Sequence, residues 1–102
     1  LSLQQAEKNL TEVKSKVYVE MRKAQNNFNL AKENYYTALD NLKLAERIEK
    51  KNIVKFFEGV SGSFQLTQAQ QQLYQAQQSK IQSMRAVIIE KTNLENILNN
   101  KN

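Results

Sequence analysis

The 102-residue sequence contains no cysteine, histidine, proline or tryptophan. Without thiols and imidazoles the chain has no disulfides, none of the usual zinc or haem ligands and no imidazole base for nucleophilic catalysis. Its carboxylates, Glu46 and Glu49 for example, have basic neighbours and no pocket-forming segment to tune them. We therefore expect no enzymatic activity and no bound metal or cofactor.

Long apolar runs are also missing from the sequence. No stretch approaches the roughly 20 apolar residues of a membrane-spanning helix, so we expect no bilayer crossing within this chain. The first residues, LSLQQAEKNL, have no initiating Met, no basic segment and no apolar run, which is unlike a targeting peptide. We expect the chain to be one part of a longer protein.

The residues that are present favour long helices. Hydrophobic residues make up 40% and charged residues 25% of the chain, with Gln, Asn, Lys and Ala abundant, so we expect a narrow apolar stripe and not a large round core. The net charge is +5, but lysines and acids are mixed in stretches such as residues 42–58. Mixed charge is typical of a solvated helix face, and we expect no binding to nucleic acid.

The spacing of apolar and alanine residues predicts two helices. In the first half they recur in steps of three and four, the heptad pattern of a helix packed along a partner helix. These residues are Leu3, Ala6, Leu10, Val13, Val17, Met21, Ala24, Phe28, Ala31, Tyr35, Ala38, Leu42, Ala45 and Ile48. The second stripe is less regular and comprises Leu66, Ala69, Leu73, Ala76, Ile81, Met84, Val87, Ile88, Leu94, Ile97 and Leu98, with Lys80 and Lys91 interrupting it.

A tight turn is predicted between the two stripes, where the only two glycines of the chain lie. Gly59 suits the left-handed residue that follows a helix, with Val60 folding back on Val54. Gly62 suits the N-cap of the next helix, with the side chain of Gln65 reaching back to it. The reversal takes about four residues, which is short enough to force an antiparallel hairpin.

The predicted fold is all-α: a long antiparallel helical hairpin, or coiled coil, with unequal arms. We expect one domain over residues 1–102, with helices over about 2–57 and 64–99 and a turn over about 58–63. The alanines at a seven-residue interval, Ala24, Ala31, Ala38 and Ala45, predict a close approach of the helices. Pairing the arms around the turn places Met84 beside Ala38 and Leu98 beside Ala24.

The first arm is predicted to extend beyond the second. At about 1.5 Å per residue the arms measure about 85 Å and about 54 Å, so residues 1 to about 20 overhang. The apolar stripe from Leu3 to Val17 has no partner there within the chain. We expect another segment of the parent protein or a second copy to cover it, and we expect the isolated chain to self-associate.

The turn and its flanks resemble a known pattern. The stretch EGVSGSFQLTQAQQQLYQAQ, residues 58–77, resembles the periplasmic hairpin tip of TolC-like outer-membrane efflux proteins. In that family a glycine turn leads into a serine, an acidic residue and then an apolar-Ala-Gln series. The stretch AQNNFNLAKENYYTALDNLKLAE, residues 24–46, resembles the long helix that precedes this tip in the second structural repeat. The resemblance covers most of the chain.

The resemblance implies a function in transport. TolC-like proteins are homotrimers whose hairpins form a helical barrel across the periplasm, continuous with an outer-membrane β-barrel. Their tips contact a periplasmic adaptor protein that is linked to an inner-membrane pump. This chain would then be the periplasmic wall and tip of an efflux or secretion conduit in a Gram-negative bacterium, in contact with the membrane only through the β-barrel of its parent protein.

The resemblance also implies site residues. The adaptor-binding tip would comprise Gly59, Val60, Ser61, Gly62 and Ser63. Gln65 and Gln68 stand where a member of the family can carry acidic residues that face the pore, so they are candidates for an uncharged pore constriction. Gly62 stands where the family usually has a serine cap, which implies a weaker start of the second helix.

Two other functions fit a helical hairpin. A periplasmic adaptor, or membrane-fusion protein, would be expected to carry an Arg and a Leu at its tip, but no Arg lies between Arg47 and Arg85. A basic RNA-binding hairpin would carry Lys and Arg on one face with interleaved aromatic residues. The tip lacks both Lys and Arg, which disfavours this alternative.

Overall fold

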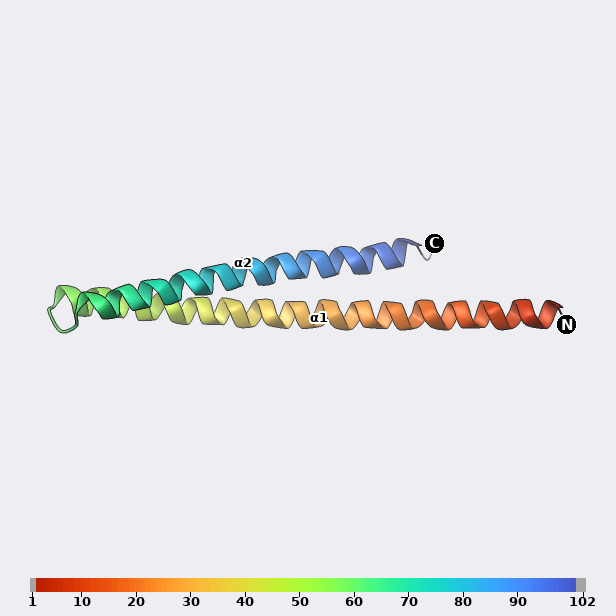
Figure 1. The fold of residues 1–102 in the computed structure, drawn as a ribbon, viewed down its shortest axis with the longest axis horizontal. Helices are drawn as coiled ribbons and strands as arrows, with labels where there is room; N and C mark the ends of the chain where they lie inside the picture. The colour runs from red at the N-terminus through yellow and green to blue at the C-terminus, as the bar shows by residue number, and fades with distance from the viewer. Residues whose placement is uncertain (1, 101–102) are drawn as a thin grey trace.

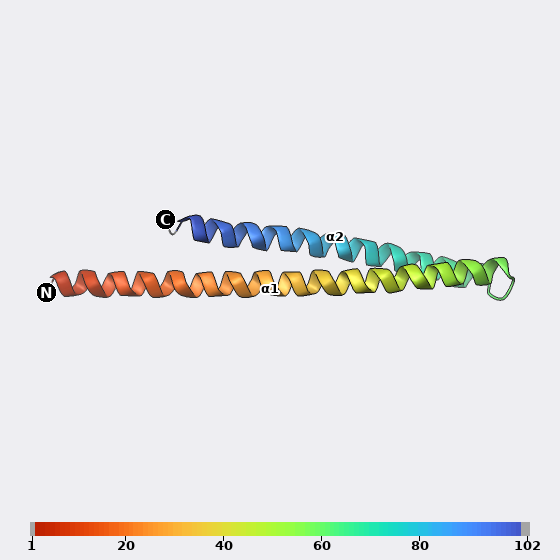
Figure 2. The same cartoon turned by 180° about the vertical axis from the view of Figure 1, so that it is seen from behind.

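The computed structural model describes residues 2–100, which form two helices joined by a short turn (Figures 1 and 2). Helix α1 covers Ser2–Phe57 and helix α2 covers Ser63–Asn100, so α2 extends one residue beyond each of its expected ends. The predicted all-α hairpin is confirmed. The domain expected over residues 1–102 also includes 1 and 101–102, which lie outside the described residues.

The molecule is a rod measuring 86 × 16 × 15 Å. The 56 residues of α1 at about 1.5 Å each span about 84 Å, so this helix alone accounts for the length of the rod. Helix α2 runs antiparallel to α1 from the turn and ends well before the N-terminal end of α1 (Figure 1).

Small side chains are the most deeply buried part of the α1 side of the seam, by which we mean the line of contact between α1 and α2. The four alanines at the seven-residue interval, Ala24, Ala31, Ala38 and Ala45, are buried, and Leu42 is the one large buried side chain among the described residues. The seven-residue interval keeps these positions on one side of a helix that packs along a partner. The predicted alanine stripe is therefore the buried face of α1.

The α2 side of the seam differs from the predicted stripe. Its buried and half-buried positions alternate in steps of three and four without interruption: Leu66, Ala69, Leu73, Ala76, Lys80, Ser83, Val87, Glu90, Leu94 and Ile97. Lys80, Ser83 and Glu90 thus occupy seam positions. Four apolar residues expected there are instead exposed, namely Ile81, Met84, Ile88 and Leu98.

Two of the predicted pairs are wrong for the same reason. Leu98 and Met84, expected beside Ala24 and Ala38, are exposed, and the half-buried positions are Ile97 and Ser83. Ile97 lines a groove together with Ala24, which places it across the seam from that alanine. The contacts nearest the turn determine which side of α2 faces α1. A continuous helix keeps that side facing its partner unless a kink or an insertion changes it.

The N-terminal part of α1 has no partner in the hairpin. Every described residue from Ser2 to Lys16 is exposed, and the Leu3 side chain is 74% exposed. Val17 is the first half-buried residue. We call residues 2–16 the overhang; its apolar side chains face solvent in the isolated chain.

Candidate functional site

The tip of the hairpin begins where α1 ends in a Schellman motif. The backbone N–H of Val60 donates to the carbonyl of Lys55 at 2.9 Å, and that of Gly59 donates to the carbonyl of Phe56 at 3.1 Å. These two hydrogen bonds define the motif. Gly59 has a φ of 74°, the left-handed conformation that glycine adopts without a Cβ penalty. The predicted role of Gly59 is confirmed.

The predicted contact of Val60 with Val54 contributes little to this turn. The two side chains remain 71% and 53% exposed, respectively. Backbone hydrogen bonds and the glycine conformation therefore hold the end of α1, and the Val60 side chain is left on the surface.

The start of α2 is capped as the sequence predicted. The backbone N–H of Gly62 donates to Oε1 of Gln65 at 3.1 Å. With Gly62 as the N-cap, Gln65 occupies the third helical position, from which a side chain closes half of a capping box. Gly62 has no side chain to close the other half. Gln65 therefore has a structural role at this helix start.

The residues expected to bind an adaptor lie in the turn and at the first position of α2, at one extreme of the rod (Figure 1). Ser61 differs from its neighbours because it is half-buried. Its Oγ is buried and has no hydrogen-bond partner among the described residues. Burying a polar atom without a partner costs free energy, so Ser61 belongs to the interior of the turn more than to its surface.

Two aromatic residues of the tip were not anticipated from the sequence as site residues. Phe57 and Phe64 are 80% and 73% exposed, and together with Val60 they form what we call the apolar tip. The Phe56 ring meets the Phe57 ring edge to face, with centroids 5.7 Å apart. The signal for the apolar tip was present in the sequence, because its residues are large, apolar and off the heptad stripe.

The chain from the tip into the first part of α2 carries little charge. Between Phe56 and Ser79 the only charged residue is Glu58. Gln65 and Gln68, the candidates for a pore constriction, lie in this segment, three residues apart on the same side of α2 and both exposed. A shallow groove farther along α2 is lined by Thr67, Gln70, Gln71, Tyr74 and Gln75, all uncharged.

The described residues contain no group of three or more side chains of the types that ligate metals. Neither α1 nor α2 has a described segment that is both long and apolar enough to cross a membrane. Comparison with protein-family models, with curated proteins and with solved structures finds no match to this chain. The resemblance to TolC-like proteins therefore rests on the quoted stretches of sequence.

Proposed function

We propose that this chain is the periplasmic wall and tip of a TolC-like outer-membrane efflux conduit, and that it has no catalytic role. The observation that carries the proposal is the exposed apolar tip at the end of an 86 Å rod. Several large apolar side chains exposed at one end of a molecule are the kind of surface that docks another protein. In the proposal, the Phe57, Val60 and Phe64 side chains meet the hairpin tip of a periplasmic adaptor.

The sides of the rod support the proposed role as a wall. Outside the seam, α2 exposes Ile81, Met84 and Ile88, and the overhang exposes a further apolar stripe. Two helices alone leave these faces open, whereas neighbouring hairpins in a closed ring would cover them. This arrangement fits a homotrimer in which the chain contributes one part of a helical barrel, with an inner-membrane pump reached through the adaptor.

The proposal is tested in cells that produce the full-length protein. This chain contains no cysteine, so Val60→Cys and Phe64→Cys each introduce one thiol within it, at the tip. A thiol-reactive crosslinker should join both variants to the same periplasmic protein. Lys14→Cys, on the overhang, is the matched control and should give no such product.

Cell fractionation separates the proposal from its alternatives. The full-length protein should be found in the outer membrane, and loss of its gene should raise the accumulation of exported dyes. If the full-length protein is instead found with the inner membrane, the result would favour a periplasmic adaptor. Recovery bound to RNA would favour a nucleic-acid-binding hairpin, and either result would overturn the conduit.

The pore candidates carry a prediction of their own. Rings of neutral Gln65 and Gln68 should give the conduit little preference for cations, since acidic rings confer that preference. Gln65→Glu combined with Gln68→Glu should raise cation selectivity and keep the cap, because Glu is a usual third residue of a capping box. Reversal potentials in a planar bilayer under a salt gradient measure this. Equal potentials for both proteins would place these residues away from the pore.

A further inference from the structure

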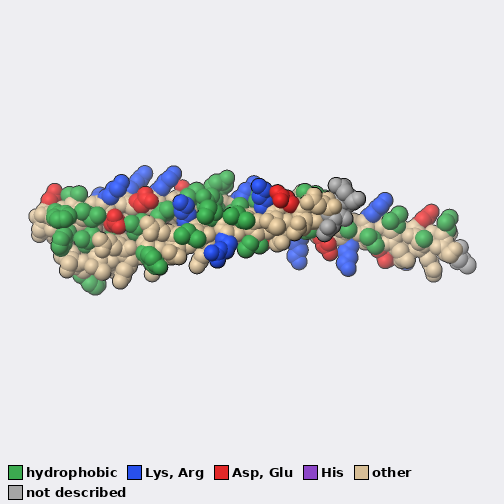
Figure 3. Space-filling model, turned by 90° about the horizontal axis from the view of Figure 1, so that it is seen from above, with side chains coloured by type: hydrophobic (Ala, Val, Ile, Leu, Met, Phe, Trp, Pro, Cys, Tyr) green, Lys and Arg blue, Asp and Glu red, His purple; other side chains and the backbone are tan. Residues whose placement is uncertain are grey.

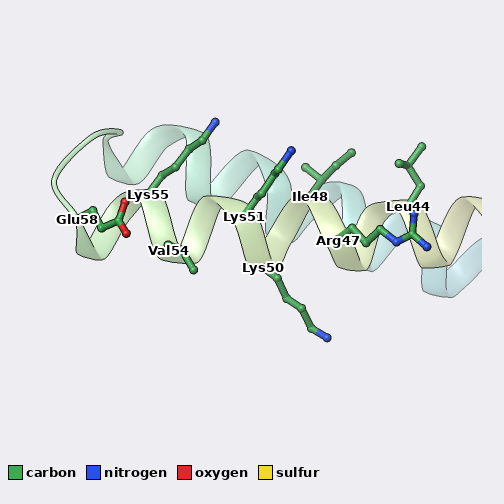
Figure 4. Close-up of a pocket in the computed structure, with 8 residues that line it drawn as sticks. All are labelled: Leu44, Arg47, Ile48, Lys50, Lys51, Val54, Lys55 and Glu58. Carbon is green, nitrogen blue, oxygen red and sulfur yellow. The ribbon is translucent and has the colours of Figure 1, made fainter.

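A groove runs along the outer surface of α1 behind the tip (Figure 4). Eight residues line it, all of them from α1: Leu44, Arg47, Ile48, Lys50, Lys51, Val54, Lys55 and Glu58. Four of these side chains are cationic and one is acidic. We call this surface the basic groove.

Helix geometry separates charges that are mixed in the sequence. Glu49 lies two residues from both Arg47 and Lys51, and at 3.6 residues per turn two residues correspond to about 200° around the helix. Glu49 is accordingly half-buried toward the seam, while Arg47 and Lys51 are exposed. The stretch that reads as a mixed, solvated face in the sequence therefore presents an excess of cations on the side away from α2.

The partner helix does not neutralise this excess. Residues 63–79 of α2, which run beside this part of α1, carry no charged side chain. Lys and Arg side chains gather along one edge of the half of the rod that contains the turn (Figure 3). The positive potential of the basic groove is thus open to a partner from outside the hairpin.

The basic groove also contains two exposed apolar side chains that fall on a helical period. Leu44 and Val54 are 55% and 53% exposed there. The positions 44, 47, 51, 54 and 58 follow one another in steps of three and four, so they form a second, outward heptad stripe on α1. From 44 to 58 this stripe is about 21 Å long, the length of about four helical turns.

We propose that the basic groove binds an amphipathic helix of a partner protein, one that carries acidic side chains on both sides of a short apolar stripe. The apolar stripe of the partner packs on Leu44 and Val54, and its acids pair with Arg47, Lys51 and Lys55. This is the arrangement by which flanking charges select partners in coiled coils and helix-in-groove complexes. The inference does not depend on the proposed conduit, because the basic groove and the apolar tip have no residue in common.

Charge identifies the occupant as a different protein and not a second copy of this chain. The acids of the overhang, Glu7 and Glu12, are interspersed with Lys8 and Lys14, and residues 63–79 are uncharged. In the rest of α2, Glu90 and Glu95 lie on either side of Lys91. Neither the overhang nor α2 therefore offers an apolar stripe flanked by unopposed acids.

Nucleic acid and membrane surfaces fit the groove less well. No aromatic side chain lines it for base stacking, and phosphates would leave Leu44 and Val54 uncovered. An amphipathic helix that lies on a bilayer needs a broad apolar face. The buried apolar face of α1 is turned toward α2 and is not available for insertion.

The test uses the purified chain and labelled synthetic helices of about 21 residues, long enough to cover the groove. One peptide has Leu at heptad positions with flanking Glu, and a second has Gln in place of every Glu. Fluorescence anisotropy should show about tenfold tighter binding of the Glu peptide, and added salt should weaken it.

Matched variants locate the binding surface. The triple variant Arg47→Gln, Lys51→Gln, Lys55→Gln should lose about tenfold in affinity for the Glu peptide. The control Lys8→Gln, Lys14→Gln, Lys16→Gln removes the same charge from the overhang and should lose less than about twofold. Leu44→Gln with Val54→Gln should weaken binding at unchanged charge. Circular dichroism checks that every variant keeps its helix content.

Three results would overturn the proposal. One is an equal loss of affinity in the groove triple and the overhang control, which would indicate unspecific attraction to net charge. The second is tighter binding to single-stranded polyuridine of about 20 nucleotides than to the Glu peptide, unaffected by Leu44→Gln with Val54→Gln. The third is tighter binding to phosphatidylglycerol vesicles than to the Glu peptide.

Discussion

The two ends of the rod differ in what holds their backbone. At the tip, α1 ends in a Schellman motif, α2 begins with a cap, and buried Ala45 and Ala69 lie on the seam behind them. At the other end the overhang is a lone stretch of α1 with exposed Leu3, Leu10 and Val13. A helical stretch without a packed face is marginal in water, because most helical stability in proteins comes from tertiary packing.

The comparison teaches that the apolar groups at the two ends are exposed for different reasons. The turn is held by backbone hydrogen bonds and a helix cap, so the exposure of Phe57, Val60 and Phe64 does not destabilise it. The overhang lacks a partner helix, although its apolar stripe has the heptad spacing of a helix that packs on one. Both ends favour partners, but we expect only the overhang to lose helical structure without one.

The largest expected effect is a contrast in hydrogen exchange between the two ends. In dilute solution the amides of residues 3–16 should exchange about a hundredfold or more faster than those of residues 24–52, because the overhang opens without unfolding the hairpin. Raising the concentration should protect the overhang as chains associate through it. Mass spectrometry after deuterium labelling measures both effects.

A matched variant shows whether the apolar stripe is responsible for this contrast. Leu10→Gln with Val13→Gln should abolish the protection at high concentration and leave residues 24–52 unchanged. A strictly monomeric chain at high concentration in analytical ultracentrifugation, with a fully protected overhang, would contradict the expected self-association.

The next effect concerns the part of α2 between the tip and the overhang, where the structure decides which side of the helix packs on α1. Val87 is on the seam and Ile88 is 58% exposed, although both belong to the predicted stripe. Val87→Gln should lower the free energy of unfolding by about 1–2 kcal/mol, whereas Ile88→Gln should change it by less than about 0.5 kcal/mol. Urea denaturation followed by circular dichroism, at a concentration where the chain is monomeric, compares them. A larger loss of stability from Ile88→Gln than from Val87→Gln would mean that Ile88, and not Val87, packs on the seam.

The last contrast separates the two glycines of the tip. Gly59→Val should destabilise the hairpin by about 2 kcal/mol, because a β-branched residue resists the φ of 74° even though open space surrounds its Cβ. At Gly62 a new Cβ would lie 3.3 Å from Oε1 of Gln65, the flexible end of a side chain that can shift. Gly62→Ser should therefore change stability by only a few tenths of a kcal/mol, in the stabilising direction.

Thermal melts of the two glycine variants provide the measurement, with the unsubstituted chain as reference. A larger loss of stability from Gly62→Ser than from Gly59→Val would mean that the left-handed residue of the turn has been assigned to the wrong glycine.

The sequence by itself determined the hairpin, its unequal arms and its turn. These features are local or periodic: alanine spacing marks the buried face of α1, a glycine after a helix permits the left-handed residue, and a Gln three residues after Gly62 closes the cap. Each depends on a few neighbouring residues, so the pattern can be interpreted without knowing what lies across the seam.

Only the tertiary structure decided which face of α2 meets α1, and with it the exposed surfaces. The irregular stripe of α2 permits two sets of seam positions that differ by one residue. Apolar content alone favours the set that includes Ile81 and Met84. The continuous heptad from Leu66 selects the other set, at the expense of placing Lys80 and Glu90 on the seam. The basic groove emerges in the same way, because charges that alternate along the sequence separate once the helix turns them to opposite sides and α2 covers one of those sides.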